Sequence, residues 1–148
     1  MLLRPLTLLS ACAALPLAGC GLFLLSARPP TYGRAELANG LVVEDLVVPK
    51  AGPRAKHGDL VTIHYEGRLE DGEVFDSSYD RGTPITFELG AGKVPRGLDE
   101  GLVGLRLGGR RKLEVPGELG YGAAGVEGLV PPDATLHFDI ELIELEGR

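Results

Sequence analysis

The stretch VTIHYEGRLEDGEVFDSS, residues 61–78, carries the strongest structural signal in this chain of 148 residues. Across residues 59–69, polar residues separate the apolar residues Val61, Ile63 and Tyr65, an alternation typical of a half-buried β-strand. An Asp-Gly pair at 71–72 then favours a tight turn, because this pair tolerates positive backbone φ angles. Residues 74–75 continue beyond the turn as a second short strand.

The rest of the chain adds more strands and one helix. Apolar patterning predicts strands at 41–48, 85–89, 110–115 and 135–145, and loops at 49–58, 76–84 and 116–134. Residues 97–103 form the one expected helix, with Leu98, Leu102 and Leu105 on one face. A sheet with one apolar face needs a cover, which this helix can supply. The predicted fold class is therefore α+β.

A second informative segment, Pro131 to Leu142, reads PPDATLHFDIEL and follows a Tyr-Gly pair at 121–122. The chain has eight aromatic residues, four Tyr and four Phe, and no Trp. Half of the eight lie in the two segments, so together with one carboxylate they could line a single apolar cleft: Tyr65, Phe75, Asp76, Tyr121 and Phe138. From the pattern alone, ordinary core packing of the rings and a turn-forming role for the Asp stay open.

Four motifs occur in the order and spacing of the FKBP-type peptidyl-prolyl cis-trans isomerases: HYEGRLEDGEVFDSS at 64–78, TFELG at 86–90, RGLDEGL at 96–102 and VPPDATLHFDIEL at 130–142. Residues 41–145 resemble that family. The resemblance implies a strongly bent antiparallel sheet wrapped around one short helix. It also implies an enzyme that rotates X-Pro bonds in an apolar pocket without covalent chemistry, metal or organic cofactor.

The resemblance implies roles for particular residues. Tyr65, Phe75, Asp76, Tyr121 and Phe138 would be catalytic, with Tyr121 donating a hydrogen bond to the substrate carbonyl. Asp76 would lie at the pocket rim, where it accepts a hydrogen bond from Tyr65 and pairs with Arg81. Arg81 could equally be a solvated loop charge. The residues expected to bind substrate are Arg81, Ile85, Phe87, Val94, Pro95, Leu98, Leu129 and Val130.

The chain departs from the family pattern at the pocket floor. Pro95 has no backbone N–H, whereas in the family the matching N–H commonly donates a hydrogen bond to a bound ligand. Leu98 stands where the family often has Trp, and Ile85 replaces an aromatic residue. These departures keep open an alternative function, a low-turnover chaperone or binding module that uses the same groove.

The N-terminal residues predict export. Arg4 precedes an uncharged stretch at 5–27, and the sequence Leu-Ala-Gly-Cys at 17–20 resembles the lipobox of bacterial lipoproteins. This indicates a signal peptide at 1–19, a lipid-anchored tether at 20–39 with Cys20 as the lipidation site, and the isomerase domain at 40–148. The protein would then face the periplasm or the exterior of the cell envelope. An uncleaved transmembrane helix is the alternative, because the uncharged run is long enough to span a bilayer.

Composition narrows the function classes further. The formal net charge of −6 argues against nucleic acid as a partner, since phosphate binding needs a basic face. The only basic run, at 110–112, is expected to be a solvated strand edge. His57, His64 and His137 lack metal-site spacing. The expected partners are proline-containing segments of unfolded or exported proteins, and the expected state is a monomer.

Overall fold

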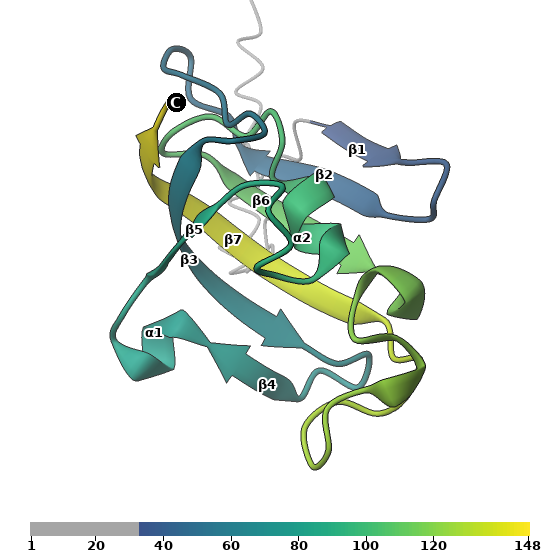
Figure 1. Cartoon of the computed structure of the whole chain (residues 1–148). Coiled ribbons are helices and arrows are strands. Elements are labelled where there is room, and N and C mark those ends of the chain that lie inside the picture. Colours follow the sequence, from purple (N-terminus) through teal and green to yellow (C-terminus); the bar gives the residue numbers. More distant parts are fainter. Residues whose placement is uncertain (1–32) are drawn as a thin grey trace, which may run out of the picture.

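A long antiparallel sheet organises residues 33–148, the part of the chain that the computed structural model describes (Figure 1). Its strands are β1 (Gly33–Glu36), β2 (Val42–Val47), β3 (Leu60–Arg68), β4 (Val74–Ser77), β5 (Ile85–Glu88), β6 (Arg110–Val115) and β7 (Leu136–Glu146). They follow the order β1-β2-β6-β7-β3-β4, and β5 pairs with the first half of β3. The sheet is open, with β1 at one edge.

Helix α2 (Arg96–Gly101) covers one face of this sheet, as Figure 1 shows. Leu98 and Leu102 point from it into a core that includes Ile63, Leu113 and Ile140, all at most 2% exposed. The predicted architecture, an antiparallel sheet around a short helix, is thus confirmed.

Two glycines let α2 approach the sheet closely. A Cβ on Gly97 would lie 2.4 Å from a Val115 methyl group, and one on Gly101 would lie 2.5 Å from a Leu113 methyl group. Because the two glycines are four residues apart, they share the helix face that rests on β6. Any side chain there would push the helix away from the strand.

The loop predicted at 76–84 is more ordered than expected. Asp76 and Ser77 belong to β4, because they pair with Gly67 and Glu66 of β3. A second short helix, α1 (Ser78–Arg81), follows directly. The Ser77 side chain accepts a hydrogen bond from the Asp80 N–H and so caps this helix. The region predicted at 116–134 as a loop contains two 3₁₀ turns, η1 (Gly117–Leu119) and η2 (Gly122–Ala124).

The basic run at 110–112 was predicted to be a solvated strand edge, and this prediction is wrong for Arg111. Strand β6 lies between β2 and β7, and the side chain of Arg111 is only 8% exposed. Its guanidinium forms a bidentate pair with Asp45, at 2.6 and 3.2 Å, and donates to the carbonyls of Gly101 and Val103 at 2.7 and 3.0 Å. The residue faces inward because it is in register with Asp45 and closes the C-terminal end of α2.

The described residues include only part of the N-terminal region to which the predictions apply. Gly33–Glu36, assigned to the tether in the prediction, form the edge strand β1 and pair with Val42–Asp45 of β2. Cys20 and the predicted signal peptide lie outside the described residues. Among residues 33–148, no helix is long and apolar enough to cross a membrane.

Replacing Arg111 with Met should destabilise the protein by about 3 kcal/mol, because it leaves the Asp45 carboxylate and two helix-end carbonyls without their donor. Partial exposure of Asp45, at 28% of its side chain, keeps the loss at the lower end of the usual range. Chemical denaturation measures this change in the free energy of unfolding. Lys112→Met, on the exposed face of the same strand, is the control and should change it by less than about 0.5 kcal/mol. Equal effects of the two substitutions would contradict a structural role for Arg111.

Candidate active site

The predicted site begins at a glycine in strand β3. Gly67 pairs with Asp76 on one side and with Phe138 on the other. A Cβ at this position would lie 2.6 Å from Cζ of Phe75 and 3.0 Å from Cε1 of Phe138. The bare backbone of Gly67 therefore lets both rings pack directly over the strand. A glycine inside a strand pattern often marks such a close approach. The sequence could therefore have indicated Gly67, which was not among the predicted site residues.

Four predicted aromatic residues form a continuous row of rings. Tyr65 and Phe138 have ring centroids 6.3 Å apart, and Phe138 meets Phe75 edge to face at 5.7 Å. Phe75 in turn meets Tyr121 edge to face at 6.3 Å. These are favourable geometries for aromatic pairs, and they connect strands β3, β4 and β7 with the loop before η2.

A cavity of about 230 Å³ lies at the end of this row. Its lining residues are Phe75, Asp76, Tyr121, Val126, Leu129 and Val130. Val126 and Val130 exchange two backbone hydrogen bonds of 2.8 Å, which close a tight loop above the cavity. Val130 is buried, whereas Leu129 is 56% exposed. Val126 was not among the predicted site residues, although the resemblance places it where eukaryotic members of the family often carry His.

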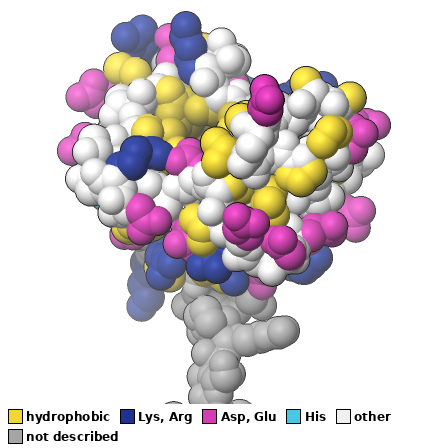
Figure 2. Space-filling view, turned by 90° about the horizontal axis from the view of Figure 1, so that it is seen from below, with side chains coloured by type: hydrophobic (Ala, Val, Ile, Leu, Met, Phe, Trp, Pro, Cys, Tyr) yellow, Lys and Arg dark blue, Asp and Glu magenta, His cyan; other side chains and the backbone are white. Residues whose placement is uncertain are grey.

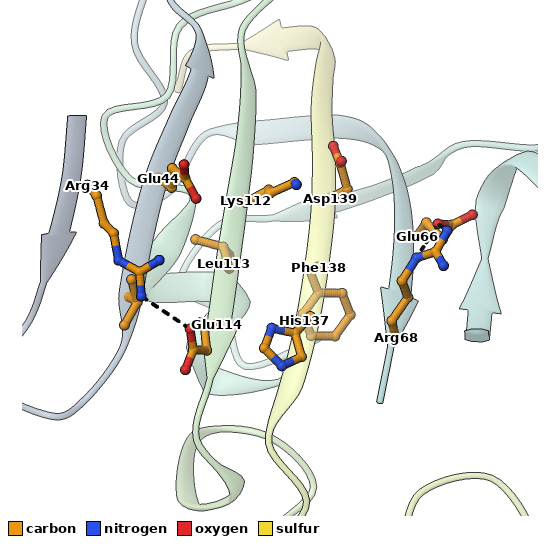
Figure 3. Close-up of a pocket in the computed structure, with 11 residues that line it drawn as sticks. Arg34, Glu44, Glu66, Arg68, Lys112, Leu113, Glu114, His137, Phe138 and Asp139 are labelled. Atoms are coloured by element: carbon orange, nitrogen blue, oxygen red, sulfur yellow. Dashed lines mark hydrogen bonds and ion pairs between the residues drawn. The ribbon is translucent and has the colours of Figure 1, made fainter. Parts of the chain in front are cut away.

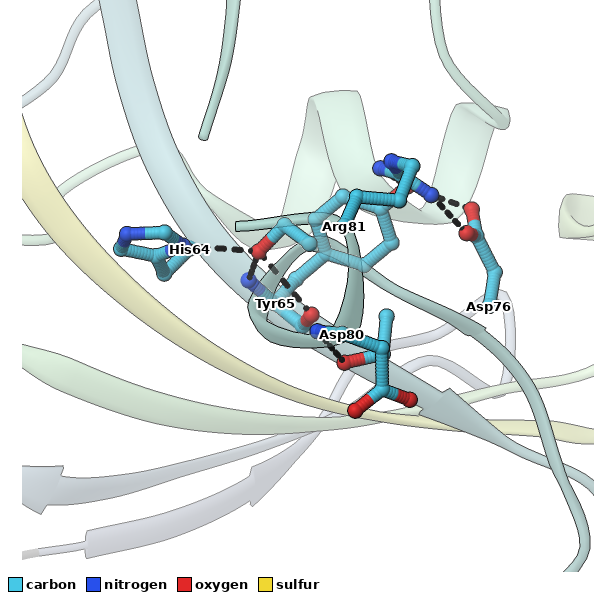
Figure 4. A network of polar contacts seen from close by, with 7 residues as sticks. His64, Tyr65, Asp76, Asp80 and Arg81 are labelled. Atoms are coloured by element: carbon cyan, nitrogen blue, oxygen red, sulfur yellow. Dashed lines mark hydrogen bonds and ion pairs between the residues drawn. The ribbon is translucent and has the colours of Figure 1, made fainter. Parts of the chain in front are cut away.

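A compact polar network links Tyr65 to Asp76 at the cavity (Figure 4). The Tyr65 hydroxyl donates to Oδ2 of Asp76, and Arg81 pairs with Oδ1 of the same carboxylate. Arg81 also donates to the Tyr65 hydroxyl at 2.9 Å, with its guanidinium carbon 5.6 Å from the centre of the Tyr65 ring. Both contacts predicted for Asp76 are thus present, and together they fix its orientation.

Helix α1 is what brings Arg81 to this carboxylate. The helix ends at Gly82, whose φ of 68° is left-handed and whose N–H bonds back to the carbonyls of Ser78 and Tyr79. At its start, Ser78 is fully buried. The Ser78 hydroxyl accepts from the Tyr65 N–H at 2.8 Å and lies 2.9 Å from Nδ1 of His64. Ser78 therefore joins α1 to β3 and fixes the backbone of Tyr65.

Both phenols at the site remain hydrogen-bond donors at neutral pH. Burial raises the pKa of Tyr65, and its hydrogen bond to Asp76 adds to this effect, while Arg81 opposes it. Burial also raises the pKa of Tyr121, and the negative charge of Asp76 contributes. An ordinary Tyr titrates near pH 10, so raised values keep both hydroxyls protonated.

The remaining predicted residues do not line this cavity. Ile85, Phe87 and Val94 line a separate hollow of about 400 Å³ along β5. Leu98 is buried in the core at 2% exposure. Pro95 precedes α2, and its carbonyl accepts the N–H of Leu98 at 2.9 Å.

Another hollow, of about 400 Å³, lies on the opposite face of the sheet (Figure 3). Strand alternation directs charged side chains there, and some of them pair with each other: Arg34 with Glu114 at 3.5 Å, and Arg68 with Glu66. This lining differs in chemistry from the aromatic cavity, and it shares only the buried ring of Phe138 with the predicted site. The aromatic cavity is the better candidate for binding an apolar ring.

Comparison with known proteins agrees with this geometry. The family described as FKBP-type peptidyl-prolyl cis-trans isomerase matches residues 52–143. The FK506-binding protein of Neisseria meningitidis serogroup C is 50% identical over 105 residues, which cover 71% of this chain and 95% of that protein. Human peptidyl-prolyl cis-trans isomerase FKBP10 is 45% identical over 139 residues, which cover 90% of this chain but 24% of that protein. The chain therefore spans about a quarter of the length of such larger relatives.

Solved structures show the same fold. The crystal structure of AtFKBP13 superposes with a TM-score of 0.71 at 41% identity and covers 78% of this chain and 99% of that chain. FkpA from Escherichia coli gives a TM-score of 0.70 at 43% identity, covering 78% of this chain and 52% of that chain. The family match spans all the residues that form the aromatic cavity, and this chain belongs to the family of FKBP-type peptidyl-prolyl cis-trans isomerases.

Proposed function

We propose that this protein catalyses cis-trans rotation about X-Pro bonds, with the proline ring bound in the cavity beside Phe75 and Tyr121. The observation that carries this proposal is the row of four rings that ends in a cavity of about 230 Å³, next to a carboxylate held by two partners. The cavity would contact a bound ring mainly through apolar side chains, and few polar groups line it.

Rotation needs no nucleophile. Amide resonance sets the barrier at about 18–20 kcal/mol, and a twisted amide has lost that resonance. Its carbonyl is less polar than that of the planar ground state, so an apolar cavity favours the twisted form relative to water. Stabilising the transition state more than the ground state is what accelerates a reaction.

The polar groups at the cavity orient the peptide. Tyr121 donates a hydrogen bond to the substrate carbonyl, because its hydroxyl stays protonated and its ring is fixed edge to face against Phe75. Asp76 supplies a negative charge at the rim, in an orientation fixed by Tyr65 and Arg81. Leu129, the most exposed of the cavity residues, covers the bound segment from the side of the loop.

Tyr121→Phe and Asp76→Asn should each lower kcat/KM for a proline peptide about tenfold, the effect of losing one transition-state hydrogen bond. Both substitutions nearly preserve volume, so the melting temperature should stay near that of the wild type. A protease-coupled peptide assay and thermal unfolding measure the two quantities. Tyr79→Phe is the matched control, because Tyr79 lies outside the cavity lining and is 47% exposed.

The same assay distinguishes the isomerase from the alternative function, a binding module. A wild-type protein that fails to accelerate proline exchange, yet suppresses aggregation of an unfolded protein, would overturn the isomerase proposal and support a chaperone. Pro95→Ile tests the departure from the family pattern at residue 95, which lies outside the cavity lining, because it restores a backbone N–H. A gain in ligand binding or activity would show that the missing N–H limits this protein.

We further propose that the protein is an exported lipoprotein that acts as a monomer on proline-containing segments of exported proteins. The support is the Leu-Ala-Gly-Cys sequence at 17–20 after an uncharged run. Acyl chains on Cys20 would hold the domain at a membrane of the cell envelope, since two or more chains give stable anchoring.

Cys20→Ser should abolish lipidation and leave an uncleaved precursor. Mass spectrometry of the mature wild-type protein should find an acylated Cys20 at its N-terminus. A mature protein that still begins at Met1 would contradict the lipoprotein proposal and support an uncleaved transmembrane anchor instead.

A further inference from the structure

A groove of about 510 Å³ continues from the aromatic cavity. The two share Val126, Leu129 and Val130, so the exposed side chain of Leu129 lies between them. The groove then runs between the loop at 123–132 and the β3–β4 turn at 69–73. Figure 2 looks onto this end of the molecule, where apolar side chains are interspersed with acidic ones.

Both walls of the groove are held by backbone hydrogen bonds. In the β3–β4 turn, Leu69 N–H donates to Glu73 O and Gly72 N–H donates to Leu69 O, each at 2.9 Å. In the facing loop, Val126 and Val130 bond to each other in both directions. A segment entering the groove would therefore meet preformed walls, which lowers the entropic cost of binding.

The charged residues that line the groove are all acidic. Asp71 and Glu73 come from the turn and Glu127 from the facing loop, and no Lys or Arg contributes to the lining. Among residues 33–148, none of these three carboxylates takes part in an ion pair. Arg68 lies near the turn and donates to Gly72 O at 3.4 Å, but its guanidinium pairs with Glu66.

We propose that a substrate segment extends from the cavity across Leu129 into this groove, and that the acidic walls select segments with Lys or Arg close to the proline. This rests on the proposed isomerase function. An extended chain advances about 3.3–3.6 Å per residue, so the groove takes residues within a few positions of the proline. The apolar floor suits the methylene stem of Lys or Arg, while the cationic end reaches the carboxylates.

Proline peptides that differ only in Lys, Gln or Glu, two residues before or after the proline, test this selection. Exchange rates should be measured by NMR, so that no coupling protease imposes its own preference. The Lys peptide should exceed the Glu peptide in kcat/KM by roughly threefold to fivefold, the range expected for exposed ion pairs. The preference should shrink as salt rises from about 0.02 M to about 0.5 M, because counterions screen exposed charges.

The double variant Glu73→Gln and Glu127→Gln should remove most of the excess of the Lys over the Glu peptide, because only Asp71 of the three acidic side chains then remains in the groove. Glu144→Gln, which removes an exposed charge from β7 outside the groove, should leave the wild-type ratio in place. Equal rates for the three peptides, or a preference that survives the double variant undiminished, would overturn the groove proposal. If even the Gln peptide shows no acceleration, the isomerase proposal itself fails, so the two failures are distinguishable.

Discussion

The close packing of helix α2 on strand β6 is the constraint on which the rest of the structure depends. Gly97 and Gly101 leave no side chains between the helix and the strand, so Val115 and Leu113 pack against bare backbone. Arg111 then ties the end of the helix to the sheet through the carbonyl of Gly101 and through Asp45 on β2. One helix of six residues can thereby cover part of a long sheet, because its contact face packs closely on β6 and Arg111 donates to the carbonyl of its last residue.

The candidate site uses the same physical device at strand β3, on the same face of the sheet, since Leu113, Phe138 and Gly67 are in register across β6, β7 and β3. Gly67 has no side chain, and the rings of Phe75 and Phe138 occupy the space above it. The row of rings then ends at the cavity, while Tyr65 at its opposite end enters the polar network with Asp76 and Arg81. Tight packing at one glycine thus determines where both the apolar and the polar parts of the site lie.

The proposed function would combine two kinds of recognition at this site. The cavity beside Phe75 is apolar and would suit a proline ring whose amide bond becomes less polar as it twists. The adjoining groove, with Asp71, Glu73 and Glu127, is acidic and open to solvent, where water and salt weaken the interaction between charges. A division of this kind would let chemistry and choice of segment vary independently, because the residues shared by the two regions, such as Leu129, are apolar.

Local patterns determined the strands, the fold class and the family of this protein, because alternation, the Asp-Gly turn and the four motifs are properties of neighbouring residues. The pairing of Asp76 with Tyr65 and Arg81 was expected only from the resemblance to the family. Only the tertiary structure decided which strands are central, and hence that Arg111 is buried in a core position although it lies in a basic run. It likewise decided that Val126 joins the cavity and that Ile85 and Val94 line another hollow, since such contacts depend on how distant segments pack rather than on the residues beside them in sequence.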